Sequence, residues 1–261
     1  MDDMQTMFDE PPITYTMPDD DAGNKFPLPK GHTAGLIIGK SGSGKTTLLL
    51  QIIPLFANLS QVIICSKIDG NPVHEGVKNW CEENEIEYEF ASEPEQAMAT
   101  IEQCVQRKEE DKFGLIVFDD FAQGCSNNRD NKYTRIMITT YQQLRNYGYR
   151  MISITQSYTG VCTLVRNNAN FIVLFPMTNI HSIRSALQDI MQATDLNVEE
   201  ARAIIQRVQR EEHGYMMISR RTVYLHLPSE RADRLFEYKK KGAEGPLSNP
   251  DNPSEQSEQS E

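Results

Sequence analysis

Eight residues near the start of the chain have the types and spacing of a phosphate-binding loop. Residues 39–46 read Gly-Lys-Ser-Gly-Ser-Gly-Lys-Thr, which is glycine, four residues of any type, then Gly-Lys-Thr. Glycines let backbone N–H groups close around phosphate oxygens, and the dipole of a following helix favours the same anion. We predict a nucleoside triphosphate site in which Lys45 reaches the β- and γ-phosphates and the Thr46 hydroxyl binds Mg²⁺. Its binding residues are Gly39, Lys40, Ser41, Gly42, Ser43, Gly44, Lys45, Thr46 and Thr47.

Two acids that follow an apolar run could complete this site. Residues 115–118 are Leu-Ile-Val-Phe, and Asp119 and Asp120 come directly after them. Ligands in open α/β sheets collect at the carboxyl ends of the strands. We therefore predict that Asp119 holds Mg²⁺ through water and that Asp120 orients or deprotonates the attacking water, although a turn or helix-capping role stays open for Asp120.

A glutamine ends the next apolar run. In "SITQS", residues 153–157, Gln156 follows a predicted strand downstream of the acid pair. An amide at this place can hydrogen-bond both the γ-phosphate and the lytic water. We predict that Gln156 senses which nucleotide is bound, provided that the sheet is ordered as in RecA-like ATPases.

The elements that must position these residues alternate between strands and helices. Near-continuous Ile/Val/Leu runs predict strands covered on both faces, at 35–39, 61–66, 114–120, 150–156 and 170–175. Helical patterns lie between them, at 45–57, 71–85, 94–110 and 132–147, and acidic residues 82–90 lead to a peripheral strand. The fold class is α/β: a RecA-like P-loop NTPase with an additional strand and a central, mostly parallel sheet flanked by helices. Helices at 181–193 and 197–211 and a β-hairpin at 214–228, turning near Arg220 and Arg221, should follow.

Other classes of P-loop protein lack support in the sequence. A transporter cassette needs Leu-Ser-Gly-Gly-Gln before the acids, and no such segment is present. A GTPase needs Asn-Lys-x-Asp, and the nearest match, residues 131–134, lacks the aspartate that reads guanine. Small-molecule kinases lack an acid pair in this setting. The nucleotide is therefore predicted to be ATP, with Mg²⁺ as its metal.

Three segments resemble the genome-packaging ATPases of large eukaryotic DNA viruses, poxviruses and virophages, a branch of the FtsK–HerA superfamily. They are "GKSGSGKTT" at 39–47, "GLIVFDD" at 114–120 and the block at 144–175, in which Arg166-Asn167-Asn168 precedes a strand. The resemblance covers about residues 33–175 and implies a homo-oligomeric ring that drives double-stranded DNA into a preformed capsid. It also implies recruitment to a capsid or portal vertex protein, and a location in the host cytoplasm, the viral factory or the virion. "GYR" at 148–150 departs from the Arg-His of many relatives and puts a role for Arg150 in doubt.

A ring could complete the catalytic site with an arginine from a neighbouring subunit. Such a finger stabilises charge on the transferred phosphoryl group and contributes roughly 10³–10⁵ in rate. Arg166, expected on the loop before the fifth strand, is the first candidate for this finger or for a γ-phosphate sensor in its own subunit. Arg145 and Arg150 come next. For each of them, a local pairing or helix-capping role stays open.

The distribution of charge agrees with a DNA-binding surface. The net charge of −11 lies mostly in the ends: residues 1–30 hold seven acids and two bases, and residues 242–261 hold five acids and no base. Residues 112–241 carry 12 acids against 18 bases. DNA contacts are expected at 122–135 and at the hairpin turn, and phosphate contacts suffice for a motor that moves over any sequence. Solvated helix faces are the simpler explanation of the same charges.

The ends and the cysteines bound the organisation of the chain. We expect residues 1–29 to form a flexible acidic, proline-rich arm, 30–241 to fold as one ATPase domain, and 242–261 to be a disordered acidic tail. The five cysteines form no Cys-x-x-Cys pair, so reduced thiols in a cytosolic compartment are expected. We expect no membrane span and no export. A cellular translocase or helicase of the same superfamily, or an adaptor that uses nucleotide only as an assembly switch, stays open as an alternative function.

Overall fold

The computed structural model describes residues 28, 32–108, 112–121, 130–194, 196–219, 222–227 and 236–238, with the backbone alone at 145, 193, 194, 222 and 236–238. Its strands are β1 Ala34–Ile38, β2 Leu59–Ser66, β3 Glu87–Ala91, β4 Phe113–Asp119, β5 Tyr149–Thr155, β6 Phe171–Leu174, β7 Tyr215–Ser219, β8 Thr222–His226 and β9 Phe236–Tyr238. Its α-helices are α1 Lys45–Ile52, α2 Pro72–Glu83, α3 Pro94–Arg107, α4 Lys132–Gln143, α5 Thr163–Asn168, α6 Ile180–Thr194 and α7 Val198–Gln209. Short 3₁₀ turns cover Ile53–Leu55 and Leu144–Tyr147.

All the described strands belong to one sheet. Its order is β3-β2-β4-β5-β1-β6-β7-β8-β9. The strands from β3 to β6 pair in parallel, and β7, β8 and β9 add antiparallel strands beyond β6. Strand β5 therefore lies between β1 and β4, and it separates the strand before the glycine-rich loop from the strand that ends in the two acids. This inserted strand confirms the predicted RecA-like α/β fold.

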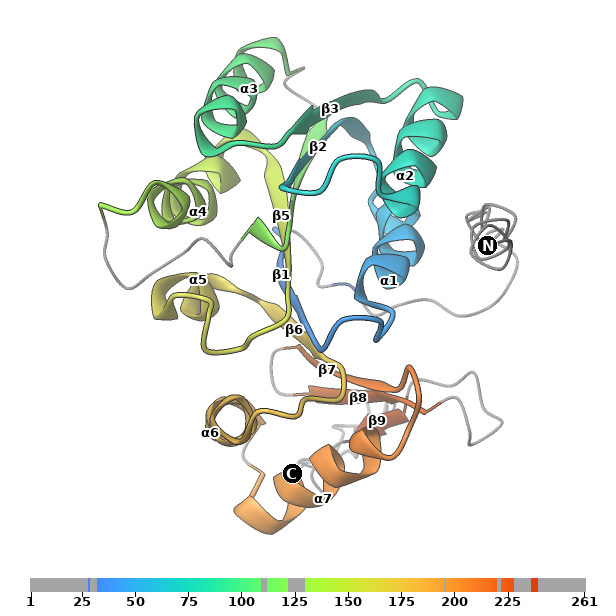
Figure 1. Cartoon of the computed structure of the whole chain (residues 1–261), viewed down its shortest axis with the longest axis vertical. Coiled ribbons are helices and arrows are strands. Elements are labelled where there is room, and N and C mark those ends of the chain that lie inside the picture. The colour runs from blue at the N-terminus through green and yellow to red at the C-terminus, as the bar shows by residue number, and fades with distance from the viewer. Residues whose placement is uncertain are drawn as a thin grey trace, which may run out of the picture.

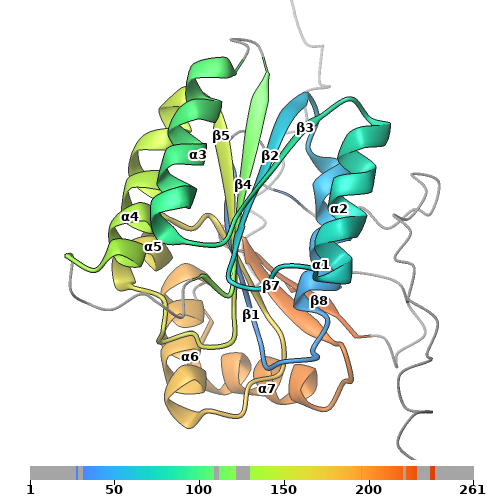
Figure 2. The same ribbon diagram turned by 45° about the horizontal axis from the view of Figure 1, so that its top comes forward.

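Helices cover both faces of the sheet (Figures 1 and 2). Helices α1 and α2 lie on one face, and α3, α4 and α5 lie on the other. Helices α6 and α7 lie beside the antiparallel end of the sheet. Each face has its own apolar cluster: Leu49 and Val77 belong to the cluster under α1 and α2, whereas Ile101 and Met137 belong to the cluster under α3 and α4. The parallel strands read as continuous apolar runs because both of their faces are covered.

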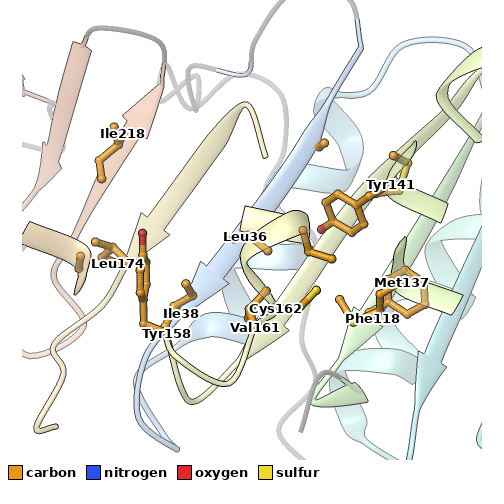
Figure 3. Packing of buried hydrophobic residues seen from close by; sticks show 14 of the residues in the cluster. Leu36, Ile38, Phe118, Met137, Tyr141, Tyr158, Val161, Cys162, Leu174 and Ile218 are labelled. Atoms are coloured by element: carbon orange, nitrogen blue, oxygen red, sulfur yellow. The ribbon is translucent and has the colours of Figure 1, made fainter. Parts of the chain in front are cut away.

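A buried tyrosine ties α4 to the centre of the sheet. The Tyr141 hydroxyl donates to the Gly35 carbonyl at 2.9 Å and lies 2.8 Å from the Ser153 hydroxyl, so α4 is fixed to both β1 and β5. Figure 3 shows Tyr141 reaching from α4 toward Leu36, with other aromatic and aliphatic side chains of this cluster around it. Burial raises the pKa of the Tyr141 hydroxyl, so it remains protonated and able to donate.

Two glycines inside strands make room for aromatic rings of the neighbouring strand. Gly35 in β1 is paired with Phe171 in β6, and Gly114 in β4 is paired with Tyr149 in β5. A Cβ atom at Gly35 would lie 2.0 Å from Phe171 Cζ, and one at Gly114 would lie 2.1 Å from Tyr149 Cε1. The rings thus fill the space above the glycine backbone, and a side chain there would have to displace a buried ring.

We predict that Gly35→Ala destabilises the fold. The added methyl group overlaps the Phe171 ring, and overpacking of this kind costs about 1–3 kcal/mol. Chemical denaturation of the nucleotide-free protein measures the loss. Phe171→Leu shortens the side chain, so the double variant Gly35→Ala/Phe171→Leu should lose less than the sum of the two single losses. If the loss of the double variant equals the sum of the two single losses in the free energy of unfolding, the predicted clash between residue 35 and the Phe171 ring is wrong.

The predicted elements are present, with boundaries that differ by a few residues. Three elements were not predicted as such. Helix α5 occupies the segment that was expected to be a loop before the fifth parallel strand, so Arg166 lies on a short helix. Strand β3 is the peripheral strand expected after the acidic segment, but its range was not predicted, and β9 was not predicted at all.

Several predictions concern parts of the chain outside the described residues. These are the N-terminal arm, the acidic tail, Cys125, most of the loop at 122–135 and the hairpin turn at Arg220 and Arg221. The other cysteines, Cys65, Cys81, Cys104 and Cys162, are buried free thiols. Of the described helices, none combines the length and the apolar character needed to cross a bilayer.

Candidate active site

The glycine-rich loop joins the end of β1 to the start of α1. Gly42 and Gly44 have φ angles of 74° and 93°, in the left-handed region that glycine adopts without strain. Gly44 also caps α1, so Lys45 is the first residue of the helix. Within the described part of the chain, the amides of Gly42 and Gly44 donate no hydrogen bond. These free N–H groups at a helix N-terminus form a site for an anion.

Lys45 lies under the loop. It is 6% exposed, and its Nζ donates to the Lys40 carbonyl at 2.8 Å. Desolvation lowers the pKa of this ammonium group, and attraction to Asp120 and Asp119 acts in the opposite direction. The loop therefore holds a positive charge that has lost much of its water, and a phosphate group would compensate for this loss.

Asp119, the last residue of β4, is buried and paired with a histidine. Its Oδ2 lies 2.9 Å from His74 Nε2. Its other oxygen, Oδ1, has no hydrogen-bond partner among the described residues. His74 belongs to the first turn of α2 and is 3% exposed. No sequence pattern indicates a role for His74, because it does not have the spacing of a metal ligand.

Asp120 and Gln156 meet beyond the ends of β4 and β5. Gln156 Nε2 donates to Asp120 Oδ2 at 3.0 Å. Asp120 Oδ1 is buried and has no partner among the described residues. The φ angle of Asp120 is 50°, a left-handed conformation that is uncommon outside glycine, with Asn and Asp among the exceptions. A strained backbone and an unsatisfied carboxylate oxygen together indicate a functional position.

Strand β5 connects the two halves of the site. The Asp120 amide donates to the Ile154 carbonyl at 2.9 Å, and the Gly39 amide donates to the Thr155 carbonyl at 3.1 Å. Consecutive residues of one strand thus hold the start of the loop and the second acid. Gln156 follows them directly. The structure therefore brings Gly39, Asp120 and Gln156 together at the carboxyl ends of the parallel strands, as predicted.

Arg166 binds the loop that follows Gln156. Its guanidinium donates to the Tyr158 carbonyl at 3.1 Å and to the Thr163 hydroxyl at 3.3 Å, and it lies 5.2 Å from the centre of the Tyr158 ring. The Tyr158 hydroxyl donates in turn to Asp189 of α6. Figure 3 shows Tyr158 lying beside Ile38 and Leu174, near the ends of β1 and β6. Among the described contacts, none joins Arg166 to Lys45, the two acids or Gln156.

Arg150 has a packing role at the other end of the parallel strands, where their amino ends lie. It lies near the start of β5, and its guanidinium is 4.2 Å from the centre of the Phe113 ring and 5.1 Å from that of Phe56. Burial lowers the pKa of this group. Arg150 is therefore not part of the site of its own subunit, which lies at the carboxyl ends of the strands.

A second histidine contacts the glycine-rich loop from the far end of the chain. His213 lies between α7 and β7, and its Nδ1 is 3.4 Å from the Ser43 carbonyl. Its φ angle is 62°, again left-handed. No sequence pattern indicated this contact, because the two residues are 170 positions apart.

The residues present fit a triphosphate with its metal. Three observations support this: free amides in the loop, a desolvated Lys45 and an orphaned oxygen on Asp120. Thr46 is half-buried at the start of α1, and Asp119 Oδ1 has no partner among the described residues. Carboxylate and hydroxyl oxygens are the ligands that Mg²⁺ prefers. A glycine-rich loop after β1, an acid pair after β4 and the inserted strand β5 between these two strands define the chain as a P-loop NTPase.

Comparison with known proteins identifies the family. The chain belongs to the family of the poxvirus A32 protein, whose family model matches residues 30–224. A search of curated protein sequences finds no significant match.

Solved structures match the fold. The genome packaging NTPase B204 from Sulfolobus turreted icosahedral virus 2, in complex with AMP, has a TM-score of 0.55 at 12% identity, over 75% of this chain and 96% of that chain. Its complex with ATP-gammaS has a TM-score of 0.55 at 13% identity, over 74% and 96% of the two chains. The DNA-packaging ATPase B204 from Sulfolobus Turreted Icosahedral Virus has a TM-score of 0.55 at 14% identity, over 74% and 95%.

Proposed function

We propose that this protein is an ATPase that drives double-stranded DNA into a preformed viral capsid, acting as a homo-oligomeric ring. The observation that carries the catalytic part is the Asp120 carboxylate. One of its oxygens is held by Gln156, and the other is buried without a partner at the end of β4. A group that only stabilised the fold would not be expected to keep a strained backbone and an orphaned oxygen.

The glycine-rich loop binds the phosphates in this proposal. The amides of Gly42 and Gly44 and the ammonium group of Lys45 would hold their oxygens. Thr46 and Asp119 would hold Mg²⁺, which neutralises charge on the phosphates and orients them. Lys45 would then exchange its bond to the Lys40 carbonyl for bonds to the β- and γ-phosphates.

Asp120 acts on the attacking water. Its Oδ1 accepts a hydrogen bond from the water and takes its proton as the water oxygen bonds to the γ-phosphorus, while the bond from the γ-phosphorus to the β,γ-bridging oxygen breaks and ADP leaves. Gln156 keeps the carboxylate in place through Oδ2 and can donate its second amide hydrogen toward the γ-phosphate. The same pair would therefore detect the loss of the γ-phosphate after hydrolysis.

A neighbouring subunit completes the site in the proposed ring. Arg166 is our candidate for the arginine finger. A guanidinium has five N–H donors, so Arg166 can keep its bonds to Tyr158 and Thr163 and still offer others to a phosphate. Its hydrogen bond to the Tyr158 carbonyl, two residues after Gln156, would link the finger to the nucleotide state of its own subunit.

DNA and a capsid vertex protein are the proposed partners. Support comes from the family and from the shared fold of a protein described as a DNA-packaging ATPase. The excess of bases over acids in residues 112–241 supports a contact with DNA phosphates that does not depend on sequence. The host cytoplasm, the viral factory and the virion are the expected locations.

Phosphate release with and without duplex DNA tests the proposal. We expect Mg²⁺-dependent release that is faster with duplex DNA of any sequence. The DNA concentration that gives half of this stimulation should rise steeply with salt, because phosphate contacts release counterions. Equal rates with and without DNA would contradict the motor and favour a nucleotide switch. Strand separation without movement along duplex DNA would favour a helicase of the cellular type.

A further inference from the structure

His74 makes its only described polar contact with the proposed metal ligand. Its Nε2 lies 2.9 Å from Asp119 Oδ2, and its Nδ1 is buried without a partner among the described residues. The ring also packs against Phe90, with 6.0 Å between the ring centres. The His74 side chain bonds to no backbone group, so its contact with Asp119 is what accounts for a polar side chain at this buried position.

The direction of this hydrogen bond follows from the chemistry of the two groups. A carboxylate oxygen can only accept, so Nε2 must carry the hydrogen and donate it to Asp119. Donation to Oδ2 fixes the rotation of the carboxylate group and leaves Oδ1 as the oxygen that has no partner among the described residues. His74 thus determines which of the two Asp119 oxygens is offered to a ligand.

The start of α2 holds the imidazole in a fixed place. The Asn71 side chain caps the helix by accepting from the Val73 amide at 3.0 Å, and Pro72 occupies the first helical position. His74 follows in the same turn, on the face that buries Val77 and Cys81. The donor therefore sits on a capped, packed helix rather than on a loop.

We propose that His74 is a positioning residue for Mg²⁺, acting through Asp119. The inference rests on the proposed function, in which Asp119 holds Mg²⁺ through water. Outer-shell partners of a metal site typically contribute about 10- to 100-fold to metal affinity or activity. Removing the donor should leave the ligand present but free to rotate, and should weaken the binding of the metal with ATP.

Three substitutions separate the hydrogen bond from the shape of the side chain. His74→Gln places an amide N–H about where Nε2 lies, His74→Met has nearly the same volume as glutamine without a donor, and His74→Asn has a donor that is too short to reach Asp119. Asp119→Asn serves as the reference for loss of the ligand itself. The folding of each variant is checked by thermal unfolding without nucleotide.

The readout is Mn²⁺ binding in the presence of ATP, followed by electron paramagnetic resonance of the full-length protein. We expect about 10- to 100-fold weaker Mn²⁺ binding for His74→Met and His74→Asn, and near wild-type binding for His74→Gln. Steady-state phosphate release should follow the same order. If His74→Met does not fold, the difference in Mn²⁺ affinity between His74→Gln and His74→Asn tests the role of the hydrogen bond.

The outcomes separate the role of His74 from the existence of the proposed metal site. Wild-type Mn²⁺ affinity in folded His74→Met or His74→Asn, with weak binding in Asp119→Asn, would overturn the role of His74 and keep the proposed metal site. Equal loss in His74→Gln and His74→Asn would also overturn it, because shape and not donation would then matter. Wild-type affinity in Asp119→Asn would remove the proposed metal site itself.

Discussion

Asp120→Asn is expected to lower kcat for ATP hydrolysis by about 10²–10⁴-fold, the usual contribution of a general base. Asparagine has the same shape and also tolerates the left-handed backbone at φ 50°. Its amide can still accept a hydrogen bond from Gln156. What it lacks is the basicity that takes a proton from water, so the loss should appear in kcat while ATP affinity stays near the wild-type value.

Single-turnover phosphate release and ATP binding, measured on the same preparation, check this prediction. Asp69→Asn is the matched control, because it changes another carboxylate to an amide in an exposed loop after β2. It should hydrolyse ATP at the wild-type rate. A kcat for Asp120→Asn within a few-fold of the wild type would assign Asp120 a structural turn and leave the water to another group.

Lys45→Met is expected to abolish the response of the protein to ATP. Removing a cation aimed at the charge that develops on phosphate typically costs about 10²–10³ in rate, and ATP affinity should fall as well. The nucleotide-free protein should be no less stable than the wild type. Its Lys45 ammonium is buried, desolvation lowers its pKa, and a methionine of similar length fills the same space without that penalty.

Thermal unfolding with and without ATP and Mg²⁺ measures both effects. The wild type should be stabilised by the nucleotide, as any ligand that binds the native state stabilises it, and Lys45→Met should not be. Lys67→Met, an exposed lysine just after β2, is the control that should keep the shift. A marked drop in the unfolding temperature of nucleotide-free Lys45→Met would show that the bond to the Lys40 carbonyl matters more than desolvation.

The parallel part of the sheet could be predicted because its strands are buried on both faces. Continuous apolar runs such as Leu115–Phe118 occur where helices cover both faces of a sheet. The spacing of the glycines after β1 is typical of a phosphate-binding loop, which joins a strand to a helix. Strand β3 gave a weaker signal. It lies at the edge of the sheet, where charged residues such as Glu87 and Glu89 are tolerated, so its sequence resembles a polar surface. Helix α5 is too short to show a helical period.

The residues that hold the site in place were harder to predict than the residues that would do chemistry. Lys45, Asp119, Asp120 and Gln156 follow apolar runs, so the rule for strand ends places them. The role of His74 depends on its contact with Asp119, which lies 45 positions away at the end of β4, so its own segment of the sequence does not indicate this partner. One signal was available: a histidine at helical spacing from the buried Val77 and Cys81 needs a buried partner.

The contact of Asp120 with Gln156, more than its left-handed backbone, limits how this position can evolve. Glutamate can adopt such a backbone, as Glu85 does at φ 56°, but its extra methylene would move the carboxylate away from the Gln156 amide. A change from aspartate to glutamate would therefore keep the negative charge and lose the contact that holds it in place.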